Sequence, residues 1–290
     1  MDPVKRSLIT LHFTVILLGA TGLFASIIPL SATDITFGRS FFACICLFLF
    51  LRFSKTSMRL KTARDYGTAM CLGVIMAVHW VTYFAAMQHA GVAVGMIALF
   101  TFPVITVLIE PLFEKIQLVW QDLFSALTVL AGVALLVPEI SLENDVTLGV
   151  MIGVFSAVLY ALRNLLHRQR FSHYSGAKAM AWQILIVAVC LLPFSSPELP
   201  DAKVETWLLL LLLGSCFTAL PHALVASSLR YLRAKTFSLI ACMQPMYGVL
   251  LAIVLLQESP GWKALIGGVL VTSASLYETL NAHKLHKRSN

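Results

Sequence analysis

Residues 66–109 read YGTAMCLGVIMAVHWVTYFAAMQHAGVAVGMIALFTFPVITVLI, a stretch without a single Asp, Glu, Lys or Arg. A helix needs about 20 predominantly apolar residues to cross the core of a bilayer, so this stretch is long enough for two. Near its middle, Gln88-His89-Ala90-Gly91 supplies the polar and glycine residues that are typical of a turn. Backbone groups in lipid have to be hydrogen-bonded within the protein, and unbroken apolarity does not fit barrel strands. The stretch therefore predicts two membrane-spanning helices joined by a tight turn.

The rest of the chain has the same apolar character. Of its 290 residues, 59% are hydrophobic and 12% are charged, and the mean hydropathy is +0.85. Soluble domains are about half apolar and about a quarter charged, so this composition excludes an ordinary soluble protein. We expect an all-α polytopic membrane protein, whose first span is a retained helix because it lacks a small-residue cleavage site. Ten transmembrane helices are predicted, at residues 8–28, 34–52, 66–87, 92–112, 119–138, 147–166, 176–194, 206–228, 236–256 and 262–280.

The basic residues predict the orientation of the chain. With the N-terminus inside, the cytoplasmic segments carry every Lys and Arg except Arg39, Lys203 and Lys263. By the positive-inside rule, both termini are then cytoplasmic and the number of spans is even. This distribution also accounts for the net charge of +7 without nucleic acid as a partner. We expect a multi-pass protein of the cell (inner) membrane. The residues assigned to the cytoplasmic side are Lys5, Arg6, Arg52, Lys55, Arg59, Lys61, Arg64, Lys115, Arg163, Arg168, Arg170, Lys178, Arg230, Arg233, Lys235, Lys284, Lys287 and Arg288.

An internal repeat relates the two halves of the chain. At a constant offset of 142 residues, Pro103 falls on Pro245 and Trp120 falls on Trp262. The repeat predicts two five-helix units, residues 1–140 and 141–290. Because each unit has an odd number of spans, the second begins on the opposite side of the membrane. Such inverted repeats are typical of secondary transporters, whose substrate site lies near the bilayer midplane between the halves.

Several short segments carry a family resemblance. In the first half they are Tyr83–Met87, Gly91–Gly95 and Phe100–Ile105, and in the second half Ala234–Leu239, Gln244–Met246 and Leu256–Glu258. These segments resemble the EamA branch of the drug/metabolite transporter superfamily. The resemblance covers the whole chain through its topology and repeat. It implies a ten-helix exporter of small metabolites, with a central cavity lined by helices 1, 3, 4, 6, 8 and 9.

The same resemblance singles out two charged residues. Arg39 stands early in the second span, where this branch often carries an arginine. Glu258 stands thirteen residues after Pro245, at the family's glutamate position. The first half departs from this pattern, since Ile116 occupies the equivalent position and Glu114 lies two residues earlier.

Polar residues inside the predicted spans are candidates for the substrate site, because ionisable side chains in a membrane are functional candidates by default. Counting ~1.5 Å per helical residue, Arg39 lies about 8 Å from the outer surface and His79 at nearly the same level. Arg39 either takes part in transport or snorkels to the headgroups. His79, Trp80 and Tyr83 share one arc of a helix. These aromatic neighbours, together with the place at the cavity that the resemblance implies for this helix, favour a substrate ligand over a packing residue for His79.

A second group of candidates surrounds the two repeat-related prolines. Pro103 and Pro245 are predicted hinges, because proline removes a backbone hydrogen bond and frees carbonyls of the preceding turn. Hydrogen-bonding or aromatic side chains near them suit a polar substrate held beside an interrupted helix. These predicted substrate ligands are Thr101, Phe102, Gln244 and Tyr247. Tyr160 is also a predicted ligand, because the same count of helical rise places it near the midplane.

Three further polar residues receive structural interpretations. Gln183 is expected to form hydrogen bonds between helices. His222 is expected to satisfy backbone carbonyls freed by Pro221. Glu110, at the inner end of the fourth span, is expected to be solvated at the interface.

These patterns predict a secondary transporter that exports small neutral or zwitterionic metabolites, such as amino acids, by alternating access. The sequence contains no catalytic motif, so we expect no enzyme, cofactor or metal site. The predicted spans hold no carboxylate at the midplane, which disfavours proton-coupled export of cationic drugs. Two alternatives stay open, a hydrophobic-drug efflux pump and a membrane scaffold or sensor. The expected partners are a small-molecule substrate and the lipid bilayer, with a monomer or a larger assembly both open.

Overall fold

A computed structural model describes residues 3–113, 118, 120–136, 141, 143–228 and 243–288. The described residues form helices and no strands. The helices are α1 (Pro3–Thr21), α2 (Phe24–Ile27), α3 (Ala32–Phe53), α4 (Ala63–Ala90), α5 (Val92–Leu99), α6 (Phe102–Ile109), η1 (Glu110–Leu112), α7 (Trp120–Leu136), α8 (Asp145–Arg170), α9 (Gly176–Leu191), η2 (Leu192–Phe194), η3 (Leu199–Asp201), α10 (Val204–Gly214), η4 (Ser215–Ala219), α11 (Leu220–Ser228), α13 (Gln244–Leu256) and α14 (Trp262–Arg288).

These helices confirm the predicted fold class. Seven described helical spans are long and apolar enough to cross a membrane. Shorter apolar helices at Leu123–Leu136, Gln244–Leu256 and Trp262–Ala274 fall in the three remaining predicted spans. Residues 236–242 of the predicted ninth span lie outside the described residues, as do 137–140 beside the predicted boundary of the two units. The division at residue 140 therefore stays a prediction.

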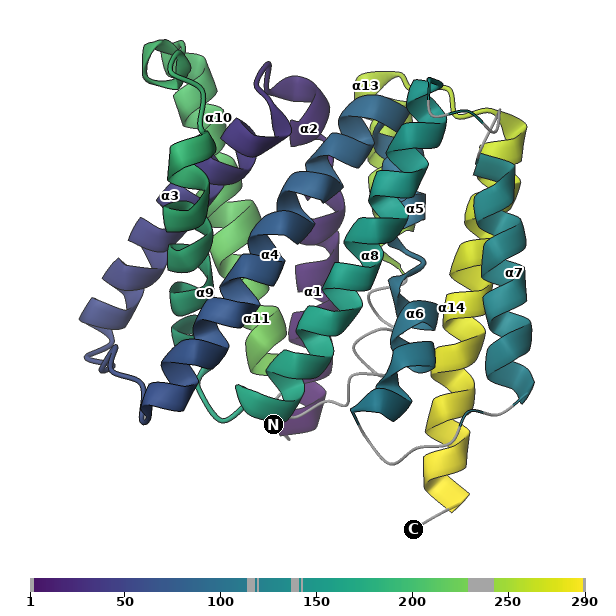
Figure 1. Ribbon diagram of the computed structural model, residues 1–290, viewed down its shortest axis with the longest axis horizontal. Coiled ribbons are helices and arrows are strands. Elements are labelled where there is room, and N and C mark those ends of the chain that lie inside the picture. Colours follow the sequence, from purple (N-terminus) through teal and green to yellow (C-terminus); the bar gives the residue numbers. More distant parts are fainter. Residues whose placement is uncertain are drawn as a thin grey trace.

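The two halves of the chain interleave around a shared centre (Figure 1). The long helix α4 of the first half packs against α8 and α9 of the second, and α1 packs against α11 and α13. At one edge of the bundle, α7 and α14 pack against each other. One apolar cluster runs through α1, α4, α5, α6, α8 and α13, so the spans from both halves share one core.

Glycines allow the closest of these contacts. A Cβ atom on Gly149 of α8 would lie 2.8 Å from the backbone nitrogen of Ala90. One on Gly95 of α5 would lie 2.8 Å from the Cα of Met87. Both distances are shorter than side-chain atoms tolerate, so these glycines bring α5 and α8 directly against α4. Gly91, with φ of +84°, makes the sharp turn between α4 and α5 in the backbone region that favours glycine.

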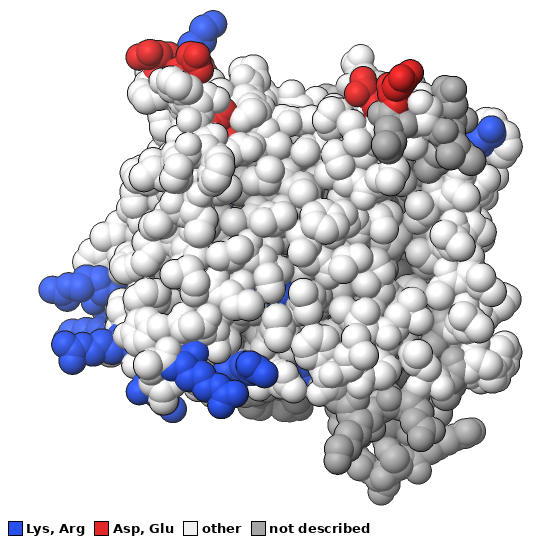
Figure 2. Space-filling model, in the orientation of Figure 1, with Lys and Arg blue, Asp and Glu red and all other residues white. Residues whose placement is uncertain are grey.

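The charged side chains separate along the axis of the bundle. Figure 2 shows Lys and Arg mainly at the lower end and Asp and Glu at the upper end. Both termini lie at the lower end (Figure 1). Arg163, counted among the cytoplasmic basic residues, is buried inside the bundle and does not lie in an exposed loop. Four of the basic residues assigned to the same side lie outside the described residues: Lys115, Arg230, Arg233 and Lys235.

Cysteine labelling tests which end faces the cytoplasm. In a background without native cysteines, we expect Arg59→Cys to react with a membrane-impermeant maleimide only in inside-out vesicles. Glu143→Cys, at the opposite end, should react only in intact cells. The physical reason is the excess of basic residues around position 59. The reverse pattern, or equal labelling from both sides, would contradict the orientation.

Candidate substrate site

The centre of the bundle contains a small cavity of about 30 Å³. This volume has room for about one water molecule. Among the predicted site residues, Arg39, His79, Trp80, Tyr83, Tyr160 and Gln244 line it. The other lining residues are Leu18, Thr21, Leu99, Phe100 and His222. The cavity therefore brings together side chains from both halves of the chain, far apart in sequence.

Arg39 is fixed in place from several sides. Its side chain is 1% exposed, so it does not reach the headgroups and the snorkelling alternative is wrong. Its Nε–H donates a hydrogen bond to the hydroxyl oxygen of Thr218 at 3.0 Å. Its guanidinium carbon lies 4.1 Å from the ring centroid of Trp80 and 5.1 Å from that of Phe84. Stacking of this kind suits the planar, delocalised guanidinium and holds its orientation.

Thr218 is a partner that the sequence did not reveal. It lies in the π-helix η4, where its hydroxyl donates to the carbonyl of Leu213 at 2.7 Å. One turn later, His222 places Nδ1 3.0 Å from the carbonyl oxygen of Thr218. His222 thus contacts a backbone carbonyl, but the carbonyl of Phe217, four residues before Pro221, accepts from the hydroxyl of Thr21 at 3.3 Å instead. The His222 ring also packs edge-on against Trp80. π-Helical turns are frequent at functional sites, but the sequence around Pro221 predicts only an interrupted helix.

His79 lies between two tyrosines. Its ring is 17° from parallel to both Tyr83 and Tyr160, with centroid distances of 6.3 Å and 4.7 Å. Its Nδ1 lies 2.8 Å from the hydroxyl oxygen of Ser156, and that hydroxyl donates to the His79 carbonyl at 2.9 Å. These bonds tie α4 to α8. The ring of His79 is therefore both packed and exposed to the cavity.

The span that contains Pro103 is broken beside the cavity. α5 ends at Leu99 and α6 starts at Phe102, which places Pro103 in the first turn of α6. Thr101 lies in the break, and its hydroxyl donates to the carbonyl of Ala98 at 2.9 Å. Thr101 does not line the cavity, and neither does Phe102, whose ring supports Tyr160 edge-on at 4.8 Å.

The second proline occupies the same place in its helix. α13 begins at Gln244, so Pro245 also stands in a first helical turn. The amide Nε2 of Gln244 donates to the carbonyl of Leu18 on α1 at 3.3 Å. Tyr247 does not line the cavity, because it packs against α1 close to Gly19.

Comparison with known proteins identifies a family that matches both halves of the chain. The profile of the EamA-like transporter family matches residues 5–137 and 147–277, which together cover most of the chain.

The chain belongs to the EamA-like transporter family.

Two transporters of other organisms are similar to this chain over nearly its full length. The uncharacterized transporter YxxF of Bacillus subtilis is 23% identical over 92% of this chain and 87% of its own length. An uncharacterized transporter of Archaeoglobus fulgidus is 23% identical over 90% of this chain and 92% of its own. A protein of known crystal structure is similar in fold, with a TM-score of 0.69 at 18% identity, covering 97% of this chain and 99% of that one. This EamA-family chain is thus a multi-pass membrane transporter, and the predicted resemblance is confirmed.

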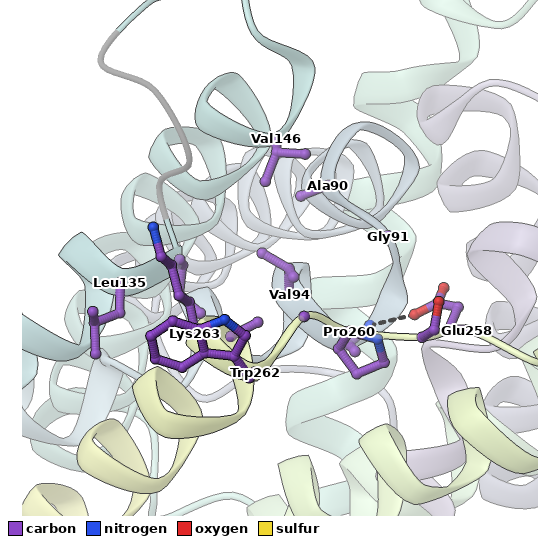
Figure 3. Close-up of a pocket in the computed structure, with 14 residues that line it drawn as sticks. Ala90, Gly91, Val94, Leu135, Val146, Glu258, Pro260, Trp262 and Lys263 are labelled. Carbon is purple, nitrogen blue, oxygen red and sulfur yellow. Dashed lines mark hydrogen bonds between the residues drawn. The ribbon is translucent and has the colours of Figure 1, made fainter.

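Glu258, which the resemblance singled out, joins the two halves of this transporter. Glu258, just after α13, accepts hydrogen bonds from the backbone nitrogens of Val92 at 2.8 Å and Ala93 at 3.0 Å. These are the first N–H groups of α5, which have no partner within the helix. Figure 3 shows the carboxylate beside Gly91 at the start of α5. A negative charge is favourable at this helix end. The first-half residue Glu114 lies outside the described residues.

A larger hollow lies at the same end of the EamA bundle. Its volume is about 520 Å³, and it lies between the start of α5, the end of α7 and the α13–α14 connection. Figure 3 shows Trp262, Lys263 and Leu135 on one side of it and Glu258 on the other. No buried side-chain atom without a hydrogen-bond partner lines this hollow among the described residues. The central cavity, which has such atoms, is the better candidate for a substrate site.

A second buried arginine lies on α8, one turn beyond Tyr160. The Nε and Nη2 atoms of Arg163 donate to the side-chain oxygen of Gln183 at 3.0 Å and 2.7 Å. Its Nη1 donates to Asn164 at 3.0 Å. These bonds confirm the predicted role of Gln183, because they connect α8 with α9. No described Asp or Glu forms an ion pair with Arg163.

Glu110 differs from its prediction. It is 3% exposed, so the expected solvation at the interface is wrong. Its carboxylate lies 3.4 Å from Nη1 of Arg168 on α8. A buried carboxylate requires such a partner, because its desolvation is otherwise costly. The sequence did not show that α6 and α8 pack together, and that contact supplies the partner.

Proposed function

We propose that this EamA-family transporter exports small neutral or zwitterionic metabolites, such as amino acids, by alternating access. It does so in the cytoplasmic membrane with both termini inside. The observation that carries the proposal is the central cavity, where a broken helix and polar side chains from both halves meet. Sites of this design, between repeats and beside interrupted helices, are typical of secondary transporters.

The small volume of the cavity fits alternating access. Its volume of about 30 Å³ is too small for a metabolite. Substrate therefore enters only when the helices around it move apart. The break between α5 and α6 gives one of these helices a place to bend. Rocking of one repeat against the other about a fixed site then exposes the cavity to each side in turn.

The charges of the site favour metabolites over cationic drugs. The cavity is lined by Arg39, and no Asp or Glu is among its described lining residues. A cation entering it would meet a buried positive charge in a medium of low polarity, which is unfavourable. A polar metabolite instead finds the side chains of Gln244, Tyr83 and Tyr160, which offer hydrogen bonds.

Flux from proteoliposomes tests the proposal. Vesicles containing the purified protein are loaded with radiolabelled amino acids or with cationic and neutral drugs, with and without a proton gradient. We expect protein-dependent efflux of one or more amino acids and no efflux of the cationic drugs. Vesicles without protein provide the control. Efflux confined to drugs would favour the efflux-pump alternative, and no efflux of any compound would favour a scaffold.

A further inference from the structure

Two buried polar atoms in the central cavity have no hydrogen-bond partner. They are Nη1 of Arg39 and the hydroxyl oxygen of Tyr83, whose side chains both line the cavity. Arg39 is 1% exposed and Tyr83 is 5% exposed. Buried polar groups in folded proteins are nearly always hydrogen-bonded, so two exceptions at one cavity require an explanation. A ligand that accepts hydrogen bonds from both atoms supplies one.

The charge around these atoms identifies the kind of ligand. Arg39 carries a fixed positive charge and has no acceptor atom, so its partner has to be an acceptor. No described carboxylate forms an ion pair with it. Asp34, five residues earlier on α3, uses its carboxylate for Ser31 and Ser196. The missing partner is therefore an acceptor with a negative charge.

We infer that Arg39 and Tyr83 form the subsite for a carboxylate group of the substrate. Nε of Arg39 is already bonded to Thr218, and one face of the guanidinium is covered by Trp80. The donors left without a partner are Nη1 of Arg39 and the hydroxyl of Tyr83. Nη1 of Arg39 and the hydroxyl of Tyr83 can each donate to one of the two oxygens of a carboxylate.

This inference deepens the proposed function and rests on it, because it names the group by which an exported metabolite is held. Amino acids and other small organic acids carry this group, whereas amines and uncharged drugs do not. The neighbouring side chains of His79, Tyr160 and Gln244 would then contact the rest of the substrate.

Matched ligands test the subsite without relying on transport. Binding of amino acids to the purified full-length protein is measured by calorimetry and compared with the amines obtained by removing only the carboxylate. Leucine with isoamylamine and phenylalanine with phenethylamine are two such pairs. We expect the amino acid that binds to do so at least about tenfold more tightly than its amine, since hydrogen bonds to charged groups are among the strongest.

The variant Tyr83→Phe removes one of the two donors and keeps the ring. We expect it to weaken binding of the amino acid about tenfold and to leave its amine unaffected. Tyr277→Phe is the matched control, because Tyr277 is an exposed tyrosine on α14 outside the cavity. Its binding should equal that of the unmodified protein.

The outcomes separate the subsite from the transport proposal. Three outcomes would overturn the subsite and leave a cavity that holds water only. They are equal binding of an acid and its amine, no binding of any acid, and unchanged affinity in Tyr83→Phe. Flux of both acids and amines at equal rates would overturn the subsite but support transport. Binding that depends on Tyr83 without any flux would support the subsite and overturn transport.

Discussion

Replacing Arg39 by leucine is expected to reduce efflux to the level of protein-free vesicles. The buried guanidinium is the only positive charge among the described residues that line the central cavity. Leucine has a similar apolar stem but offers no donor and no charge. The protein should still be extracted in normal amounts and elute as a single species, since α3 keeps its packing against α9 and α10.

The variant Arg39→Lys tests whether transport needs the specific contacts of the buried guanidinium or only a positive charge near the membrane surface. A lysine would keep the charge but lose both the Nε bond to Thr218 and the planar stack on Trp80. We therefore expect it to retain roughly a tenth of the efflux rate or less. The control is Arg52→Gln, an exposed arginine near the other end of α3, which should retain full efflux. Full activity in Arg39→Lys would contradict the buried role.

Much of this architecture can be predicted directly from patterns in the sequence. Long apolar runs must become helices in lipid, and the bounds of α3, α4 and α8 agree with the predicted spans to within about four residues. Helical spacing placed His79, Trp80 and Tyr83 on one arc, and depth placed Arg39 at nearly the level of His79, but only the structure shows that all four line one cavity. Such arithmetic works because a transmembrane helix has a fixed rise and a fixed length.

Pairing between distant helices could not be derived in this way. Depth alone placed Arg163 and Glu110 near the inner end, where basic and acidic side chains are normally solvated. Their burial depends on which helices surround them, since Gln183 on α9 bonds Arg163 and Arg168 on α8 lies beside Glu110. Neither contact can be predicted from the spacing of apolar residues in the sequence. The π-helix that presents Thr218 to Arg39 is equally a product of tertiary packing.

Thr101, Phe102 and Tyr247 were also predicted to be substrate ligands but do not line the cavity. These residues flank the repeat-related prolines, so proximity in sequence made them candidates. Whether such a residue lines the cavity depends on the direction of its side chain. The hydroxyl of Thr101, for example, donates to the backbone carbonyl of Ala98. Phe102 supports a lining residue rather than lining the cavity itself.

The variants Pro103→Ala and Pro245→Ala are expected to slow turnover about tenfold while leaving substrate affinity within about threefold. Each proline stands in the first turn of a helix, and Pro103 has no N–H to donate to the carbonyl of Leu99, four residues earlier. Alanine at position 103 restores an N–H that can bond the carbonyl of Leu99. α5 and α6 would then join into one helix that resists bending. The control is Pro111→Ala, at the far end of the same span in η1, which should keep normal turnover.

Variants of the residues that line the cavity distinguish an effect on helix bending from an effect on substrate binding. Trp80→Ala and Gln244→Ala should instead raise the dissociation constant, by about tenfold for Trp80, which is 2% exposed and stacks on Arg39. Calorimetry gives the affinity of all the variants, and initial efflux rates at saturating substrate give the turnover. Normal turnover in both proline variants would place the bending point elsewhere. Unchanged affinity in both Trp80→Ala and Gln244→Ala would place the substrate away from this cavity, since both side chains line it.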